Sequence, residues 1–179
     1  KATGVVKPMI GAEVRVGSRV SGVVKKLHVR IGDAVEKGKL LAELDATELV
    51  ARVEQADAAL ASARATLRYA STDLERNEQL AAEKLVSTDE LELRRRARDV
   101  AEAQGAEAQA NLDYARIQLG WARIVAPIAG VVASISTQEG ETVAASFASP
   151  TFVTLLDVAR LEVRAYVDET DIGRIETGR

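Results

Sequence analysis

The sequence predicts an α+β fold in which a small β sandwich made of two halves carries an inserted helical hairpin. Residues 47–120 contain no proline and repeat apolar residues in steps of three and four, which is the spacing of a helix seam that faces a partner helix. The segments before and after it alternate apolar and polar residues between glycine-containing turns, as β-strands do. One β pattern occurs in both of these segments, which indicates an internal duplication.

The helical segment divides into two arms. The first arm has the seam Leu49, Val53, Ala56, Leu60, Ala63, Leu67, Ala70, Leu74, Asn77 and Ala81, and the second has the looser seam Leu91, Ala101, Gly105, Ala108, Leu112, Ala115 and Leu119. The phase breaks at 83–87, and Ser87 followed by Thr88, Asp89 and Glu90 is typical of a helix N-cap with acidic residues in the first turn. We therefore expect an antiparallel coiled-coil hairpin over 47–120, with its tip near 82–88 and arms on the order of 50 Å long.

The duplication in the β segments has a constant spacing. Residues 21–35 reappear as 129–143 at an offset of 108, and 40–45 reappear as 152–157 after an insertion of four residues before Pro150. Each half is too small to bury a core alone, so the halves are expected to pack on each other with near-twofold symmetry. The sequence thus predicts one β domain, 12–46 with 121–158, that is interrupted by the hairpin.

Composition excludes several classes of function. The chain of 179 residues has a net charge of −3 and 3% aromatic residues, so it lacks the basic excess and the stacking surface of nucleic-acid-binding proteins. It has no cysteine, which excludes disulfides and thiolate metal sites. The sequence shows no phosphate-binding glycine loop, no His-paired nucleophile and no metal-ligand cluster. We expect a protein that is not an enzyme and carries no cofactor.

Four short motifs of the β segments resemble the biotinyl/lipoyl-carrier domain: Gly-x-Val at 22–24, Gly-Asp-x-Val at 32–35, Lys-Gly-x-Leu-Leu at 37–41 and Ala-Pro-x-x-Gly at 126–130. In those carriers a lysine in the turn between the halves holds the cofactor. Glu48 stands at that place here, and a carboxylate cannot form the amide that holds lipoate or biotin. The resemblance therefore implies a split lipoyl-like β sandwich that carries no cofactor.

A lipoyl-like domain split by a coiled-coil hairpin resembles the periplasmic adaptors, or membrane fusion proteins, of bacterial tripartite efflux and type I secretion systems. The resemblance implies a periplasmic subunit that links an inner-membrane transporter to a TolC-like outer-membrane channel as a homo-oligomer, a hexamer in our interpretation. Because the chain starts at Lys1 rather than methionine, the N-terminal anchor to the inner membrane is expected to be absent from it.

The expected tip carries a motif of these adaptors. Arg76, Leu80 and Ser87 fit the spacing R-x3-L-x6-S, which in the adaptors marks the end that docks the channel. A structural alternative is that Leu80 packs the tip, Ser87 caps the second helix and Arg76 is a solvated charge. Capping and docking are compatible, and exposed residues at loop tips are often functional.

The second β half contains a possible channel-lining loop. Residues 124–127, 138–143 and the insertion before Pro150 look most like adaptors of ABC-type macrolide exporters, in which a glutamine of this loop lines the axial channel. Here Gln138 and Glu139 precede Gly140, and Glu139 occupies the place of Ile31 in the first half, where it is expected to break the apolar pattern. Glutamates in a ring would form a negative constriction; the alternative is an exposed turn charge.

The chain ends are expected to form part of a β-barrel domain from 1–11 and 159–179, with a strand at 160–167 and a short helix at 172–175. Arginines 94, 95, 96 and 98 are expected to pair with acidic residues within their own helix. Three other functions stay open: a carrier domain of an acyl-transfer complex, an adaptor of an RND pump or type I secretion system, and a coiled-coil scaffold unrelated to export.

Overall fold

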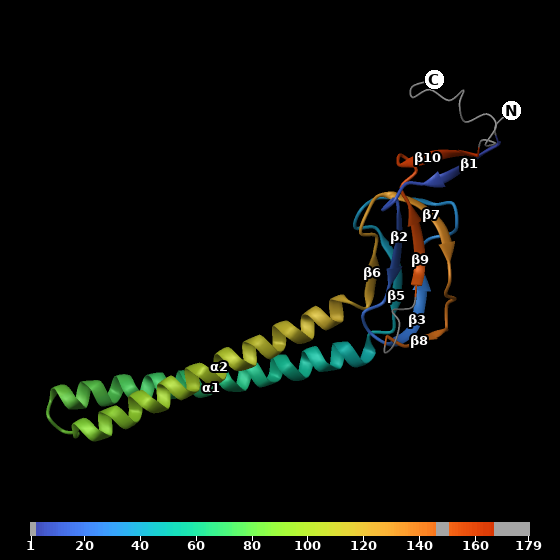
Figure 1. The fold of residues 1–179 in the computed structure, drawn as a ribbon. Helices are drawn as coiled ribbons and strands as arrows, with labels where there is room; N and C mark the ends of the chain where they lie inside the picture. The colour runs from blue at the N-terminus through green and yellow to red at the C-terminus, as the bar shows by residue number, and fades with distance from the viewer. Residues whose placement is uncertain (1–2, 146–150, 167–179) are drawn as a thin grey trace, which may run out of the picture. The chain divides into compact units, whose positions relative to one another are not determined.

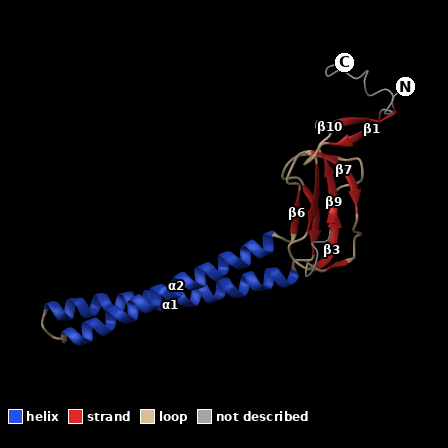
Figure 2. Ribbon diagram, in the orientation of Figure 1, coloured by secondary structure: helices blue, strands red, loops and turns tan. Residues whose placement is uncertain are grey.

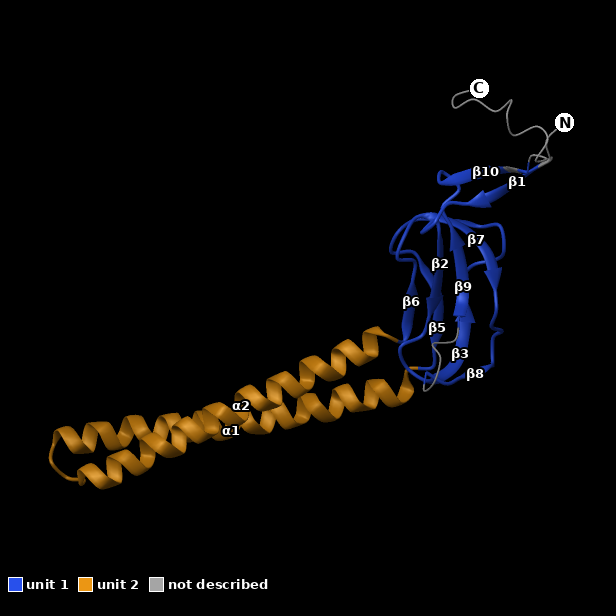
Figure 3. Cartoon of the chain, viewed as in Figure 1, with its two compact units in different colours: residues 1–45, 122–179 blue, residues 46–121 orange. Residues whose placement is uncertain are grey.

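The computed structural model describes residues 3–145 and 151–166, and it confirms the predicted fold class. Strands β1–β5 precede helices α1 and α2, and β6–β10 follow them (Figures 1 and 2). The chain forms two compact units, 1–45 with 122–179 and 46–121 (Figure 3). The strands are β1 (Thr3–Pro8), β2 (Glu13–Gly17), β3 (Gly22–Leu27), β4 (Ala34–Val35), β5 (Leu40–Leu44), β6 (Arg123–Val125), β7 (Gly130–Ile135), β8 (Thr142–Val143), β9 (Thr151–Leu156) and β10 (Leu161–Tyr166).

The sandwich consists of two four-stranded antiparallel sheets, ordered β2-β9-β7-β4 and β6-β5-β3-β8. Each half of the chain donates one short strand to the sheet of the other half, because β4 pairs with β7 and β8 pairs with β3. Gly22 lies opposite Val143 in one sheet, and Gly130 lies opposite Val35 in the other. These two pairs correspond at the offset of 108, so the duplicated sequence folds as a near-twofold duplication.

The core follows the same symmetry. Val24 and Val132, which correspond at that offset, are each 1% exposed. The Val24 amide donates to the Glu141 carbonyl at 2.9 Å, and the Val132 amide donates to the Asp33 carbonyl at 3.0 Å. Each half therefore supplies both a buried valine and the turn carbonyl that the other half needs, which explains why neither half is expected to fold alone.

The hairpin consists of α1 (Thr47–Ala82) and α2 (Thr88–Gly120). All ten predicted seam residues of α1 are buried or half-buried, as are all seven predicted for α2. Three cross-helix contacts follow a single antiparallel register: Arg116–Asp57 at 3.9 Å, Arg64–Gln109 at 3.0 Å and Arg95–Glu78 at 3.4 Å. Leu60 of α1 and Leu112 of α2 are buried.

The looser pattern of α2 has a specific cause. Arg94 and Arg98 are half-buried, and they continue the three- and four-residue spacing of the seam between Leu91 and Ala101. The heptad repeat of α2 is therefore continuous, but two of its seam positions hold arginine. The expected pairs within the helix are present for Arg94, Arg96 and Arg98, which contact Glu90, Glu92 and Glu102. Arg94 and Arg95 also reach across to α1, which the pattern did not predict.

Strands β1 and β10 form a separate two-stranded antiparallel sheet, from Thr3 opposite Tyr166 to Pro8 opposite Leu161. The insertion before Pro150 and the short helix expected at 172–175 lie outside the described residues. The division of the β part into a sandwich and a partial barrel domain stays a prediction. Within residues 3–145 and 151–166, neither helix combines the length and the hydropathy that a membrane span requires.

Candidate functional site: the hairpin tip

The tip turn is closed by backbone hydrogen bonds at the end of α1. The Lys84 amide donates to the Ala81 carbonyl and the Leu85 amide to the Leu80 carbonyl, both at 2.9 Å. Lys84 has a φ of 61°, so the last turn is a Schellman motif with a lysine where glycine is usual. Leu80 is the residue whose carbonyl closes this motif, which places it at the base of the turn.

Ser87 starts the second helix, as the sequence predicts. Its backbone is extended, and its Oγ accepts a hydrogen bond from the Glu90 amide at 3.2 Å. Asp89 and Glu90 lie in the first turn of α2, where negative side chains stabilise the helix by interacting favourably with its dipole. The hydroxyl proton of Ser87 is not used by this bond, so capping leaves the side chain able to donate to a partner.

Arg76 lies one turn before Leu80 on α1 and is exposed. Among the residues that the structure describes, its guanidinium has neither a hydrogen bond nor an ion pair, whereas Arg95 and Arg96 of α2 are both paired with glutamates. Leu85 in the turn is 66% exposed. The three predicted residues thus lie in the last two turns of α1, for Arg76 and Leu80, and at the N-cap of α2, for Ser87. Docking itself stays a prediction.

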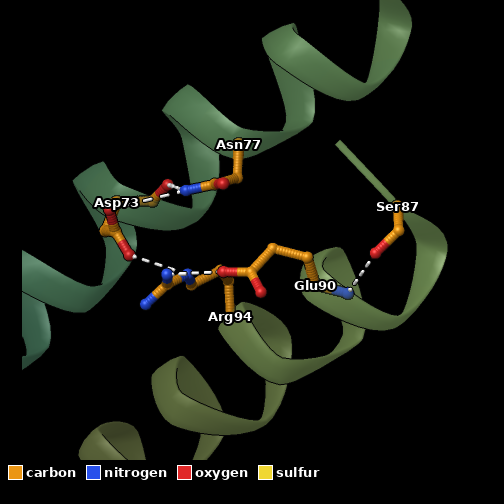
Figure 4. Close-up of polar contacts among 5 residues, drawn as sticks. All are labelled: Asp73, Asn77, Ser87, Glu90 and Arg94. Atoms are coloured by element: carbon orange, nitrogen blue, oxygen red, sulfur yellow. Dashed lines mark hydrogen bonds and ion pairs between the residues drawn. The ribbon is translucent and has the colours of Figure 1, made fainter. Parts of the chain in front are cut away.

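A polar layer lies directly behind the tip (Figure 4). Arg94 of α2 contacts Asp73 of α1 at 3.4 Å and Glu90 of its own helix at 2.5 Å. Asn77, which is 9% exposed, donates from Nδ2 to the Asp73 carbonyl at 2.8 Å. One cation therefore holds two carboxylates from different helices. Sequence analysis identified Asn77 as a seam residue but missed Arg94, whose position in the heptad was the available signal.

The loop at 138–141 folds against the first half of the sandwich. Glu139 Oε1 accepts from the Leu27 amide at 2.8 Å, and Glu141 Oε2 accepts from the Gln138 amide at 2.9 Å. The expectation that Glu139 breaks an apolar position is wrong, because its counterpart Ile31 is itself 66% exposed. Gln138, Glu139 and Glu141 border a surface concavity of about 580 Å³. Whether the loop lines a channel stays a prediction.

Glu48, which stands where carriers have their lysine, lies in the first turn of α1. Its carboxylate pairs with Arg52 at 2.6 Å, one helical turn further on. The segment that forms a tight turn between halves in a carrier is thus the start of a helix here. This geometry gives the carrier interpretation no attachment site at that position.

Comparison with known proteins shows the same architecture elsewhere. A family model described as "RND MFP, barrel-sandwich hybrid domain" matches residues 12–155. The chain is 34% identical to the macrolide export protein MacA of Escherichia coli O157:H7, over 93% of this chain and 49% of that protein. It is also 34% identical to the pyoverdine export membrane fusion protein PvdR of Pseudomonas aeruginosa, over 92% of this chain and 46% of that one. The chain spans about half the length of these relatives.

Solved structures agree with the sequence comparison. The crystal structure of MacA from Actinobacillus actinomycetemcomitans matches with a TM-score of 0.65 and 31% identity, over 98% of this chain and 58% of that one. A MacA–MexA chimera that contains the Pseudomonas aeruginosa MexA α-hairpin matches with a TM-score of 0.70 and 31% identity, over 98% and 56% of the two chains. The chain therefore belongs to the membrane fusion proteins, the adaptor family of efflux systems.

Proposed function

We propose that this chain is the part of a periplasmic efflux adaptor that docks a TolC-like outer-membrane channel through the tip of its helical hairpin. The observation that carries the proposal is the end of the hairpin, where Arg76 of α1 has no hydrogen bond or ion pair among the described residues, Leu85 in the turn is largely exposed and Ser87 has a proton to donate. A guanidinium and a hydroxyl beside an apolar side chain are suited to a protein partner that offers carbonyl or carboxylate groups around an apolar contact.

The inner-membrane partner in this proposal is an ABC-type exporter. The residues at 124–127 and 138–143 resemble adaptors of macrolide exporters, and the 34% identity to a macrolide export protein extends over almost the whole chain. The RND label of the matching family model names the alternative partner type. Attachment to the inner membrane through an N-terminal anchor and assembly as a hexamer belong to the same proposal.

Gln138 and Glu139 are the proposed lining of the axial channel in the β part. The hydrogen bond from the Leu27 amide holds one carboxylate oxygen of Glu139 on the sandwich. Glutamates held in this way around a ring axis would form a fixed negative constriction, because each backbone bond limits how far its carboxylate can swing away. Glu139→Gln keeps an acceptor for Leu27 while removing the charge, so it should change the passage of anionic compounds and leave folding unchanged.

Complementation of a deletion strain tests the adaptor function. The double variant Arg76→Ala/Ser87→Asp changes two tip side chains but keeps an N-cap acceptor for α2. The matched control Arg68→Ala/Ser71→Asp changes the same residue types at exposed positions about three to four turns below the tip. We expect the control to restore export and the tip variant to fail at equal protein levels. Full export by a folded tip variant would overturn the proposal.

A further inference from the structure

Asp73 of α1 and Glu90 of α2 lie beside the two polar residues that are proposed to dock the channel. Asp73 precedes Arg76 by three residues, and Glu90 follows the N-cap Ser87 by three. Residues three apart on a helix are neighbours on its surface, so each carboxylate lies about one turn behind a docking residue. A group that holds the two carboxylates together therefore also limits how far Arg76 and Ser87 can move apart.

The Arg94 guanidinium holds both of these carboxylates (Figure 4). Its Nε lies 3.4 Å from Asp73 Oδ2, and its Nη2 lies 2.5 Å from Glu90 Oε1. A guanidinium is planar and rigid, so it fixes the geometry of its partners more strictly than a lysine ammonium does. We call Asp73, Glu90 and Arg94 the tip clamp. It joins the tip end of α1 to the first turn of α2.

Both acidic residues of the tip clamp have a second anchor. Asn77 Nδ2 donates to the Asp73 carbonyl at 2.8 Å and to Asp73 Oδ1 at 3.5 Å. The Glu90 amide donates to Ser87 Oγ at 3.2 Å. Asn77 directly follows Arg76 in the sequence and is only 9% exposed. A continuous chain of hydrogen bonds and ion pairs thus runs from the N-cap of α2 to the seam of α1.

Apolar packing is weak at this end of the hairpin. Between residues 61 and 100, all of which the structure describes, Asn77 is the only buried residue. Buried apolar residues such as Leu60, Leu112 and Ala115 lie nearer the base. Segments with few buried apolar contacts open and shift more easily than well-packed ones. The relative position of the two helices near the tip therefore depends on polar contacts.

A similar arrangement near the base of the hairpin provides a comparison. Arg116 of α2 lies 3.9 Å from Asp57 of α1 and 3.8 Å from Asp113 of its own helix. These three side chains are between 56% and 64% exposed, whereas those of the tip clamp are between 21% and 39% exposed. Exposed ion pairs contribute little to stability, and salt screens them more than it screens partly buried ones. The tip clamp is thus the stronger of the two arrangements.

We propose that Arg94 is a positioning residue for docking: the tip clamp holds α1 and α2 in the arrangement in which Arg76 and Ser87 meet the channel together. The proposal rests on the proposed function, since it needs a channel to dock. Groups that are already in place do not have to be ordered on binding, so preorganisation strengthens association. Without the tip clamp, the seam still keeps the helices together, but the two docking residues shift independently and bind more weakly.

The double variant Asp73→Leu/Arg94→Leu separates positioning from stability. Replacing a partly buried ion pair with apolar side chains is often neutral or stabilising, so the melting temperature should stay the same or rise. The affinity of the full-length protein for the outer-membrane channel should nevertheless fall about fivefold or more. Asp57→Leu/Arg116→Leu, which removes the exposed arrangement near the base, is the matched control and should bind as the wild type does. Wild-type affinity in the Asp73/Arg94 variant would rule out a positioning role.

A distance measurement without the channel tests the tip clamp itself. The chain contains no cysteine, so spin labels can be attached at Gln79→Cys and Asp89→Cys, which are exposed positions on the two sides of the tip. Arg94→Lys keeps the positive charge but lacks the planar fork, and it should broaden or shift the distribution of distances between these labels. Labels at Ala61→Cys and Asn111→Cys, nearer the base, should give the same distribution with and without Arg94→Lys. An unchanged 79/89 distribution would overturn the proposal.

The two measurements distinguish this inference from the proposed function. If Arg76→Ala weakens channel binding and Asp73→Leu/Arg94→Leu does not, only the positioning role of Arg94 fails. If the spin labels show the expected change but neither of these variants weakens channel binding, docking through the tip is contradicted.

Discussion

Asp73 of α1 and Arg94 of α2 face each other across the hairpin seam, with 3.4 Å between Oδ2 and Nε. The Arg94 Nε is buried, and the described residues offer it no hydrogen bond, so the carboxylate attracts it by charge alone. The pair lies beside Asn77 near the tip of the hairpin. Nearer the base of the hairpin, the buried seam residues Leu60 and Leu112 are apolar. Polar residues in a seam stabilise less than leucines but restrict the register. The tip end of the hairpin is thus its least apolar part.

Replacing Asn77 with leucine should stabilise the hairpin by about 1 kcal/mol, because it buries an apolar side chain in place of an amide. Removing the amide should cost little stability, because its hydrogen bond goes to the Asp73 carbonyl of the same helix. The substitution therefore leaves no group of α2 without a partner. Thermal unfolding followed by circular dichroism measures the change. Asn111→Leu, at an exposed position of α2, is the control. A lower melting temperature for Asn77→Leu would show that the amide is needed for packing.

Gly105→Ala should also stabilise the hairpin, by about 1 kcal/mol, because glycine is a poor residue for the interior of a helix. A Cβ at Gly105 would have no atom within 4 Å, so the alanine fits without a clash. Denaturant unfolding measures the change as a higher midpoint, with the dependence of the unfolding free energy on denaturant concentration unchanged. Gly120→Ala, at the last residue of α2 and equally free of clashes, should give a smaller gain. Destabilisation by Gly105→Ala would contradict the packing described for this layer.

The two symmetry-related glycines of the sandwich should respond differently to alanine. A Cβ at Gly130 would lie 2.6 Å from the Leu156 carbonyl oxygen, whereas a Cβ at Gly22 would lie 3.7 Å from the Leu44 side chain and 3.8 Å from the Asp45 carbonyl oxygen, which are ordinary contact distances. We expect Gly130→Ala to lose about 1–3 kcal/mol of stability and Gly22→Ala to be nearly neutral. Urea unfolding of both variants measures this, and equal losses would contradict the closer backbone approach at Gly130.

Ser87 allows capping and docking to be measured apart. Ser87→Ala should cost about 1 kcal/mol of helix stability through loss of the acceptor for the Glu90 amide, whereas Ser87→Asp should retain that stability. If the hydroxyl also donates to a channel, both variants should bind the channel more weakly. Thermal unfolding and a binding titration, carried out on the same variants, separate the two roles. Normal channel binding by Ser87→Asp would show that Ser87 caps α2 but does not take part in docking.

The fold was predictable because its signals are repetitive. Ten regular seam positions in α1 and a duplication at an offset of 108 each repeat one physical requirement many times, so a single unusual residue such as Asn77 does not hide the pattern. The Ser87 cap was predictable for a different reason. A hydroxyl followed by acidic residues is a local arrangement whose geometry depends on few other contacts.

The details that were missed depend on partners distant in sequence. The sequence predicts pairs within the helix for Arg94 because it does not show how deep this position lies in the seam, and only the folded hairpin brings the Asp73 carboxylate within 3.4 Å of its guanidinium. The duplication predicts an apolar position for Glu139 because Ile31 corresponds to it, but both residues are exposed and Glu139 reaches the Leu27 amide 112 residues away. Long charged side chains can satisfy such positions, so apolar patterns do not define them.

The central claim is that the tip docks an outer-membrane channel, and the affinity of the full-length protein for that channel tests it most directly. Arg76→Ala removes a guanidinium that has no partner among the described residues, so folding should be unaffected while affinity falls about tenfold or more. Arg68→Ala removes another exposed arginine from the same helix and should bind as the wild type does. Equal affinities for the wild type and both variants would contradict docking through the tip.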